Sequence, residues 1–161
     1  MISEPGDPSG SPDSGVVVED EQDVPLDTEG LRTTAARALE FLGVPAAAGL
    51  SVTLVDPEQM AELKQQALGV HAATDVLSFP MDSLDDPMPG PLVLGDIVVC
   101  PAVAARQAAA LGHSMDDEMS QLLVHGILHV LGWDHDDAAS ERAMRANERR
   151  VLSAVSSERT L

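Results

Sequence analysis

Residues 125–135 have the sequence HGILHVLGWDH and hold three of the five histidines of this 161-residue chain. His125 and His129 are four positions apart in a segment of helical patterning, so their rings are expected on one helix face, about one turn apart. Two imidazoles at this spacing suit a single zinc ion. Gly132 permits a left-handed backbone that turns the chain back, which lets His135 approach the same ion as a third ligand. Three neutral ligands leave one position of a tetrahedral zinc open, and an open position is typical of a catalytic site.

Other interpretations of these histidines compete with the zinc site. Two histidines at this spacing are often ordinary, partly buried residues, but a third one just beyond a glycine favours metal binding. Zincin peptidases carry a glutamate directly after the first histidine as the general base, whereas this chain has Gly126. A zinc metallopeptidase-like hydrolase is therefore a remote alternative that needs a distant acid as its base. The remaining histidines, His71 and His113, lie in turn-like contexts and are expected at the surface.

The charge of the chain argues against a general nucleic-acid-binding protein. There are 27 acidic residues and nine Lys and Arg, for a net charge of −18. Residues 1–30 hold nine of the acids and no base, so the rest of the chain is about half as acidic as the whole. Such a field repels phosphates. Two Phe, one Trp and no Tyr also leave few rings on which bases can stack.

Several protein classes are excluded by the same composition. No apolar run approaches the ~20 residues of a membrane helix, so we expect no membrane span. The first residues have neither the basic nor the apolar region of a secretory signal. Cys100 is the only cysteine and cannot form an internal disulfide. A reducing, cytoplasmic location is the resulting expectation.

The patterning predicts one α+β domain with two tails. We expect a disordered acidic tail over 1–14, a folded domain over 15–155 and a short C-terminal tail over 156–161. Short apolar runs predict strands, and helical spacing between Asp, Ser, Pro and Gly signals predicts helices. The predicted strands are 16–18, 51–55, 76–79 and 92–100, with a loop over 82–91. The predicted helices are 28–42, 57–67, 101–111, 114–131 and a last one that starts at Asp136 or Asp137 and continues through Leu152. This order predicts a small mixed sheet packed with about five helices.

Three separate motifs resemble one known family. The segment HGILHVLGWDH resembles the HGxLHLxGxDH signature of the YbeY endoribonucleases, also called rRNA maturation factors. Residues 74–80 (TDVLSFP) and 95–97 (GDI) match two strands of that family, and a C-terminal helix with Met144 and Glu148 fits its pattern. The likeness covers roughly residues 16–152 in the order of the family.

The resemblance implies a metal-dependent endoribonuclease with one zinc ion bound by His125, His129 and His135. Family members act in the 3′-end maturation of 16S ribosomal RNA and in ribosome quality control, which implies small-subunit precursor RNA and the ribosome or its small-subunit proteins as partners. Zinc would activate water or a phosphoryl oxygen, and either attack by water or assistance to the RNA 2′-hydroxyl remains open. Asp134 can orient an imidazole or manage a proton, or it is only a turn residue. Three histidines also suit nickel, copper or iron.

The chain departs from the family at two positions near the expected cleft. The family usually carries an arginine several residues before the TDVLSFP strand, but residues 63–73 contain none. Lys64 is the only Lys or Arg there, and an ammonium does not replace a bidentate guanidinium, so Lys64 is a weak catalytic candidate that is equally a solvated helix residue. Trp133 stands where the family often has tyrosine and can stack on a base or cap the core. The missing arginine and the net charge support an alternative, a ribosome-assembly factor that binds zinc with little or no cleavage.

RNA contact is expected to depend on the last predicted helix. Arg142, Arg145 and Arg149 are spaced to share one of its faces, and Arg150 follows them. These residues can contact phosphates. Alternatively, Glu141 with Arg145, and Glu148 with its neighbouring arginines, form ion pairs within the helix.

Overall fold

The computed structural model describes residues 15–82, 90–133 and 137–159. The predicted tail over 1–14 and most of the predicted loop over 82–91 lie outside these residues. So do Asp134 and His135.

Four strands form one mixed sheet. They are β1 (Gly15–Asp20), β2 (Gly49–Leu54), β3 (Val76–Pro80) and β4 (Val93–Val99), in the spatial order β1-β2-β4-β3. β1 pairs with β2 and β2 with β4 in parallel, whereas β3 pairs antiparallel with β4 at the edge. The order of strands and helices along the chain is the one predicted, and the α+β class with a small mixed sheet is confirmed.

Five helices accompany the sheet: α1 (Thr28–Phe41), α2 (Pro57–Leu68), α3 (Pro101–Leu111), α4 (Met115–Val130) and α5 (Ala138–Arg159). Local signals explain their starts. The Asp56 side chain accepts a hydrogen bond from the Gln59 N–H in a reciprocal capping box, and the Ser114 side chain accepts from the Asp117 N–H. The Ser140 N–H donates to the Asp137 carboxylate at 2.8 Å, so Asp137, one of the two predicted caps, begins α5.

Helix α5 extends further than the sequence suggested. It continues to Arg159, four residues into the segment 156–161 that was predicted as a tail. Val151 and Val155 are buried on its inner face, one turn apart, and no glycine or proline follows to stop the helix. The tail prediction was therefore wrong for 156–159.

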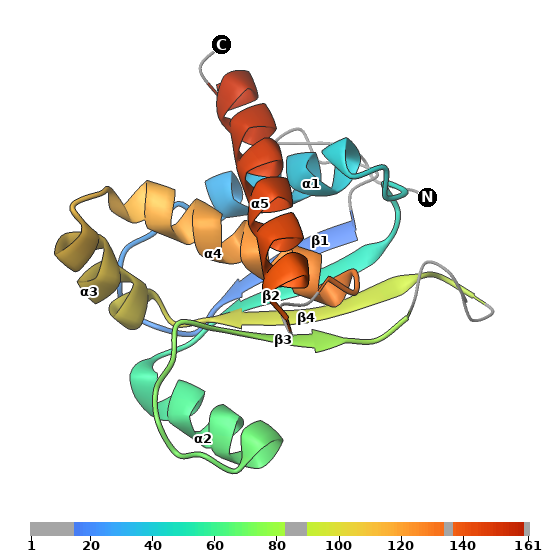
Figure 1. Ribbon diagram of the computed structural model, residues 1–161. Helices are drawn as coiled ribbons and strands as arrows, with labels where there is room; N and C mark the ends of the chain where they lie inside the picture. Colours follow the sequence, from blue (N-terminus) through green and yellow to red (C-terminus); the bar gives the residue numbers. More distant parts are fainter. Residues whose placement is uncertain (1–14, 83–89, 134–136, 160–161) are drawn as a thin grey trace.

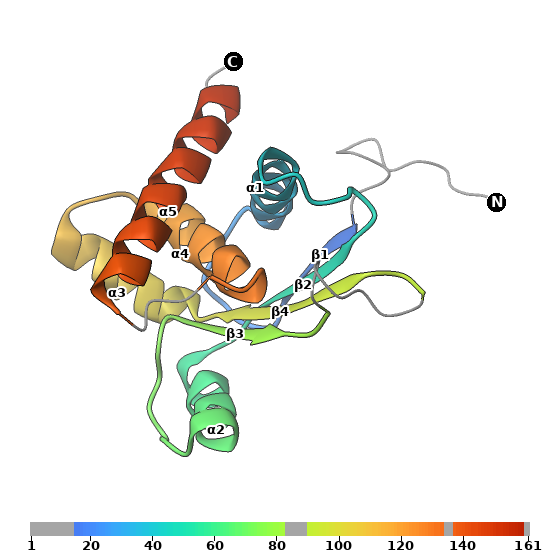
Figure 2. The same ribbon diagram turned by 45° about the vertical axis from the view of Figure 1, so that its right-hand side comes forward.

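The helices divide between the two faces of the sheet (Figures 1 and 2). Helices α1, α4 and α5 cover one face, and α2 lies against the other. Alternation along β4 explains the division, because Ile97 belongs to the core under α4 whereas Val98 packs with Met60 and Leu63 of α2. None of the helices in the described part of the chain has the length and apolarity that crossing a bilayer requires.

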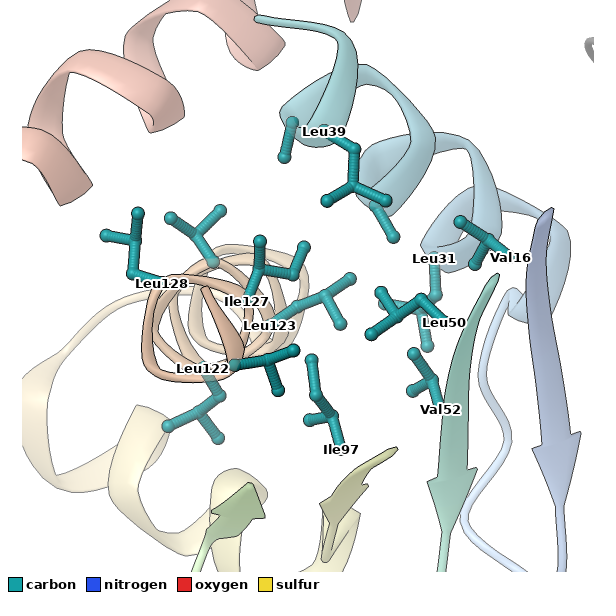
Figure 3. Packing of buried hydrophobic residues seen from close by; sticks show 14 of the residues in the cluster. Val16, Leu31, Leu39, Leu50, Val52, Ile97, Leu122, Leu123, Ile127 and Leu128 are labelled. Carbon is teal, nitrogen blue, oxygen red and sulfur yellow. The ribbon is translucent and has the colours of Figure 1, made fainter. Parts of the chain in front are cut away.

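The main core lies between α4 and the sheet. In Figure 3, side chains of α4 point toward the sheet and toward α1. The labelled members are Val16, Leu31, Leu39, Leu50, Val52, Ile97, Leu122, Leu123, Ile127 and Leu128. Helix α4 is thus fixed along most of its length, and so are the positions of the histidines that it carries.

Candidate metal centre

Helix α4 presents His125 and His129 together, as their spacing predicted. The two ring centroids are 4.7 Å apart and the ring planes meet at 73°. Both residues are partly exposed, whereas their neighbours Val124 and Leu128 are buried in the core. The pair therefore lies where the buried face of α4 meets solvent, a position from which two imidazole nitrogens can converge on one ion.

A carboxylate from α5 holds the first of these rings. Nδ1 of His125 contacts Oε2 of Glu148, 23 residues further along the chain. A carboxylate only accepts hydrogen bonds, so this contact assigns the proton to Nδ1 and makes Nε2 the candidate ligand atom. The side chains of His125 and Glu148 are 32% and 16% exposed, so the contact is partly shielded from water. This is the arrangement by which proteins orient metal-binding histidines.

The residue after the first histidine lies against the sheet. The Ser78 hydroxyl of β3 donates to the Gly126 carbonyl at 3.3 Å. A Cβ at position 126 would lie 2.9 Å from Cγ2 of Ile97 and 3.3 Å from the Ser78 oxygen. Position 126 corresponds to the one that bears the general base in zincin peptidases, but here the space for a side chain at this position is filled by Ile97 and Ser78 of the sheet. Helix α4 can pack this closely against the sheet because residue 126 has no side chain.

The chain turns sharply directly after His129. The N–H of Gly132 donates to the His129 carbonyl at 3.0 Å and the N–H of Trp133 to the Leu128 carbonyl at 2.9 Å, the two bonds of a Schellman motif. Gly132 has φ of 103°, in the region that favours glycine. The turn brings the N–H of Trp133 back to the last turn of α4, and the left-handed backbone predicted at Gly132 is present.

The structure does not bring all of the other predicted site residues close to His125 and His129. His135 and Asp134 follow the turn but lie outside the described residues, and within the described ranges no three or more His, Cys, Asp or Glu side chains group as metal ligands. Lys64 is on α2, on the face of the sheet opposite to α4. His71 is exposed and contacts the Gln65 side chain, and His113 contacts the buried Glu118.

Two ionisable groups near the start of α5 have shifted pKa values. Hydrogen bonds from the backbone and side chain of Ser140 hold the pKa of Asp137 below its ordinary value of 3.8. The hydrogen bond and charge of Glu141 raise the pKa of Arg145. The Glu141–Arg145 ion pair predicted within the helix is present, with a distance of 2.9 Å.

The role of Glu148 was missed from the sequence, where it was interpreted as a partner of neighbouring arginines. A signal was available in its spacing. Met144, Glu148, Val151 and Val155 recur at helical intervals, and the other three are buried apolar residues. An acid on the inner face of a helix needs a partner across the packing interface, and the histidines of α4 were the available candidates.

The comparisons agree with this fold and with the family that the sequence resembles. The family model described as Endoribonuclease YbeY matches residues 17–156. Proteins named Endoribonuclease YbeY are similar to this chain: that of Salinispora tropica is 44% identical over 154 residues, covering 90% of this chain and 98% of the relative, and that of Thermobifida fusca is 47% identical over 140 residues, covering 84% and 90%. The solution structure of TM1509 from Thermotoga maritima superposes with a TM-score of 0.65 at 25% identity, over 89% of this chain and 90% of that one. The resemblance inferred from the motifs is confirmed, and the chain belongs to the YbeY endoribonuclease family.

Proposed function

We propose that this protein is a cytoplasmic, zinc-dependent endoribonuclease that cleaves single-stranded RNA in the 3′-end maturation of 16S ribosomal RNA and in ribosome quality control. The observation that carries the proposal is the pair His125 and His129, with ring centroids 4.7 Å apart and the first ring oriented by Glu148. His135 is the proposed third ligand because it follows Gly132 by three residues, and the turn at Gly132 bonds Trp133 back to Leu128, in the last turn of α4.

The residues present fit a zinc ion. Two neutral imidazoles one helical turn apart, with an acceptor on Nδ1 of the first, form a nitrogen donor set of the kind zinc prefers. A zinc ion held there supplies Lewis-acid activation of water and of a phosphoryl oxygen. Glu148 keeps the proton of His125 on Nδ1 and fixes the direction of the ring. The close packing of Gly126 against Ile97 fixes the height of α4 above the sheet.

The first experiment combines zinc content with cleavage. Zinc bound per chain is measured in the purified protein, and cleavage of single-stranded ribosomal precursor RNA is followed on a gel. His125→Ala and His129→Ala are each expected to lose both zinc and cleavage. His71→Ala is the matched control, because His71 is exposed on the far side of the sheet and should keep both. Cleavage that persists in His129→Ala would overturn the proposed catalytic role.

A second candidate function is favoured by the absence of the arginine that the family usually carries before the TDVLSFP strand. Residues 63–73 contain no arginine, and Lys64 is carried by α2 on the opposite face of the sheet from His125. A ribosome-assembly factor with bound zinc and little cleavage fits this departure. In cells carrying His129→Ala, accumulated precursor RNA with retained binding to ribosomal particles would favour the enzyme. Normal precursor processing would favour the assembly factor.

A further inference from the structure

The basic residues of this acidic protein are concentrated on one helix. Five of the nine Lys and Arg of the chain fall within the bounds of α5, at positions 142, 145, 149, 150 and 159. Arg142, Arg149 and Arg150 are exposed, and no ion pair of theirs with a carboxylate is found among the described residues. In a chain with a net charge of −18, α5 is therefore the helix that offers a polyanion the most basic residues.

Two of the three aromatic residues lie beside the same helix. The chain has three aromatic side chains other than histidine, and two of them are exposed: Phe41 at 45% and Trp133 at 38%. Phe41 ends α1, and Trp133 follows the turn after α4. An exposed ring is unfavourable in water, so two of three rings left exposed beside a basic helix point to a ligand that covers them.

Each ring lines a groove along one face of α5. A groove of about 600 Å³ is bounded by Phe41 of α1 and by Ala146, Arg149, Arg150, Ser153 and Ala154 of α5. A second groove of about 340 Å³ is bounded by Trp133 with Leu131 and Gly132, and by Ser140 and Ala143 of α5. Positions 143, 146, 150 and 153 follow one another at helical intervals of three and four, so both grooves lie on one side of α5. At 1.5 Å per residue, Ala143 and Arg150 are about 10 Å apart along the axis.

In the larger groove, the guanidinium group of Arg150 is held over the Phe41 ring. The guanidinium carbon of Arg150 lies 5.7 Å from the centre of the Phe41 ring, and Nη1 of Arg150 donates to the Asn147 side chain at 2.8 Å. Bases stack on aromatic rings and on guanidinium planes alike, so this pair forms a platform for a base, and the exposed Arg149 beside it can bind a phosphate. Among the acids whose side chains the structure describes, Glu148 faces His125 and Glu141 pairs with Arg145, and Glu40 is adjacent to Phe41 in the sequence.

We propose that this face of α5, from Trp133 to Phe41, binds single-stranded RNA, with a base stacked at Phe41 and Arg150 and a phosphate at Arg149. The proposal rests on the proposed function in one respect, that the strand continues to the histidine pair. An acidic polypeptide would also suit the arginines. RNA is favoured because the two grooves each pair a ring with the basic helix, which matches the alternation of bases and phosphates in a strand.

The test measures binding of a 12-nucleotide 2′-O-methyl oligouridylate that carries one 4-thiouridine and resists cleavage. Fluorescence anisotropy of the zinc-loaded full chain gives the Kd at several salt concentrations. Phe41→Leu is expected to raise the Kd about fivefold or more, because one stacked base is lost. Arg149→Gln is expected to raise the Kd as well and to reduce the salt slope by about 0.7, because the one phosphate contact is lost. Arg106→Gln, an equal charge change at an exposed position of α3, is the matched control.

Crosslinking locates the contact. Ultraviolet light is expected to attach the 4-thiouridine to the peptide containing Phe41 or to the one containing Trp133. The proposal is overturned if Phe41→Leu binds like the unmodified chain, or if poly-glutamate competes as well as RNA, which would mark the face as a surface for acidic proteins. Binding is read without cleavage, so loss of zinc-dependent cleavage with these results intact would refute the proposed function alone.

Discussion

The imidazole of His125 on α4 and the carboxylate of Glu148 on α5 are in direct contact, with Nδ1 of the ring against Oε2 of the acid. This contact joins two helices whose facing residues are otherwise mostly apolar. It fixes both the tautomer and the direction of a proposed zinc ligand. Its removal should affect metal binding before it affects the fold.

Glu148→Gln is predicted to weaken zinc binding by about 10- to 100-fold, because the neutral amide accepts the Nδ1 proton without raising the basicity of the ring. Competition with a chromogenic chelator measures the affinity. Glu141→Gln is the control, since Glu141 pairs with Arg145 on the exposed side of the same helix. Equal zinc affinity in the two variants would refute the orienting role.

Gly132→Ala is predicted to lower the free energy of unfolding by about 1–2 kcal/mol, because its φ of 103° strains any residue with a Cβ. It should also weaken zinc binding, since it alters the turn that links α4 to the proposed third ligand His135. Gly112→Ala at the end of α3, with φ of 76° and open space around it, should cost similar stability and leave zinc affinity unchanged. Denaturant unfolding and chelator competition on both variants test this prediction.

Gly126→Glu is predicted to lower the free energy of unfolding by at least about 3 kcal/mol, because a carboxylate would be placed against Ile97 and Ser78. It should give no peptidase activity. Gln121→Glu adds the same charge to an exposed position of α4 and should change stability little. Urea unfolding of the two variants provides the comparison, and equal stability would contradict the packing described here.

Asp137 is predicted to stabilise the start of α5 more strongly while it is ionised than when it is protonated. Its pKa is held below 3.8 in the folded protein, so its contribution is fully present above that value and is lost as the pH falls through the folded pKa. Thermal unfolding should therefore show Asp137→Ala less stable than the unmodified chain at pH 7, with the difference shrinking toward pH 3. Asp137→Asn keeps a capping acceptor and should lose less at pH 7. A difference that stays constant with pH would contradict this account.

Local signals made most of the fold predictable from the sequence. The Asp56-Pro57 pair begins a helix with a reciprocal cap, and Gly112 ends another with a left-handed residue, so these boundaries depend on neighbouring residues alone. The spacing of His125 and His129 likewise required only the geometry of one helix. Predictions of this kind succeeded because short-range stereochemistry determined them.

Long-range packing set the features that were missed. Glu148 meets His125 because α5 crosses α4; the spacing within α5 indicates that Glu148 faces inward, but not which residue it meets. Lys64 lies away from the histidines because α2 packs on the Val98 side of the sheet, and a helix of its pattern could have covered either face. Helix α5 extends to Arg159 because the burial of Val155 stabilises its last turns.

The contact at Gly126 also bears on how this site can diverge. A general base beside the first histidine requires a side chain at position 126, and that side chain requires space now filled by Ile97 and Ser78. Each change alone is harmful, since a glutamate clashes with the sheet and a truncated Ile97 leaves a cavity under a close-packed helix. A lineage would have to make both changes together to reach zincin-type chemistry from this scaffold. This protein and a zincin peptidase with the same histidine spacing are thus separated by an epistatic barrier. The barrier arises because there is no space for one side chain at position 126.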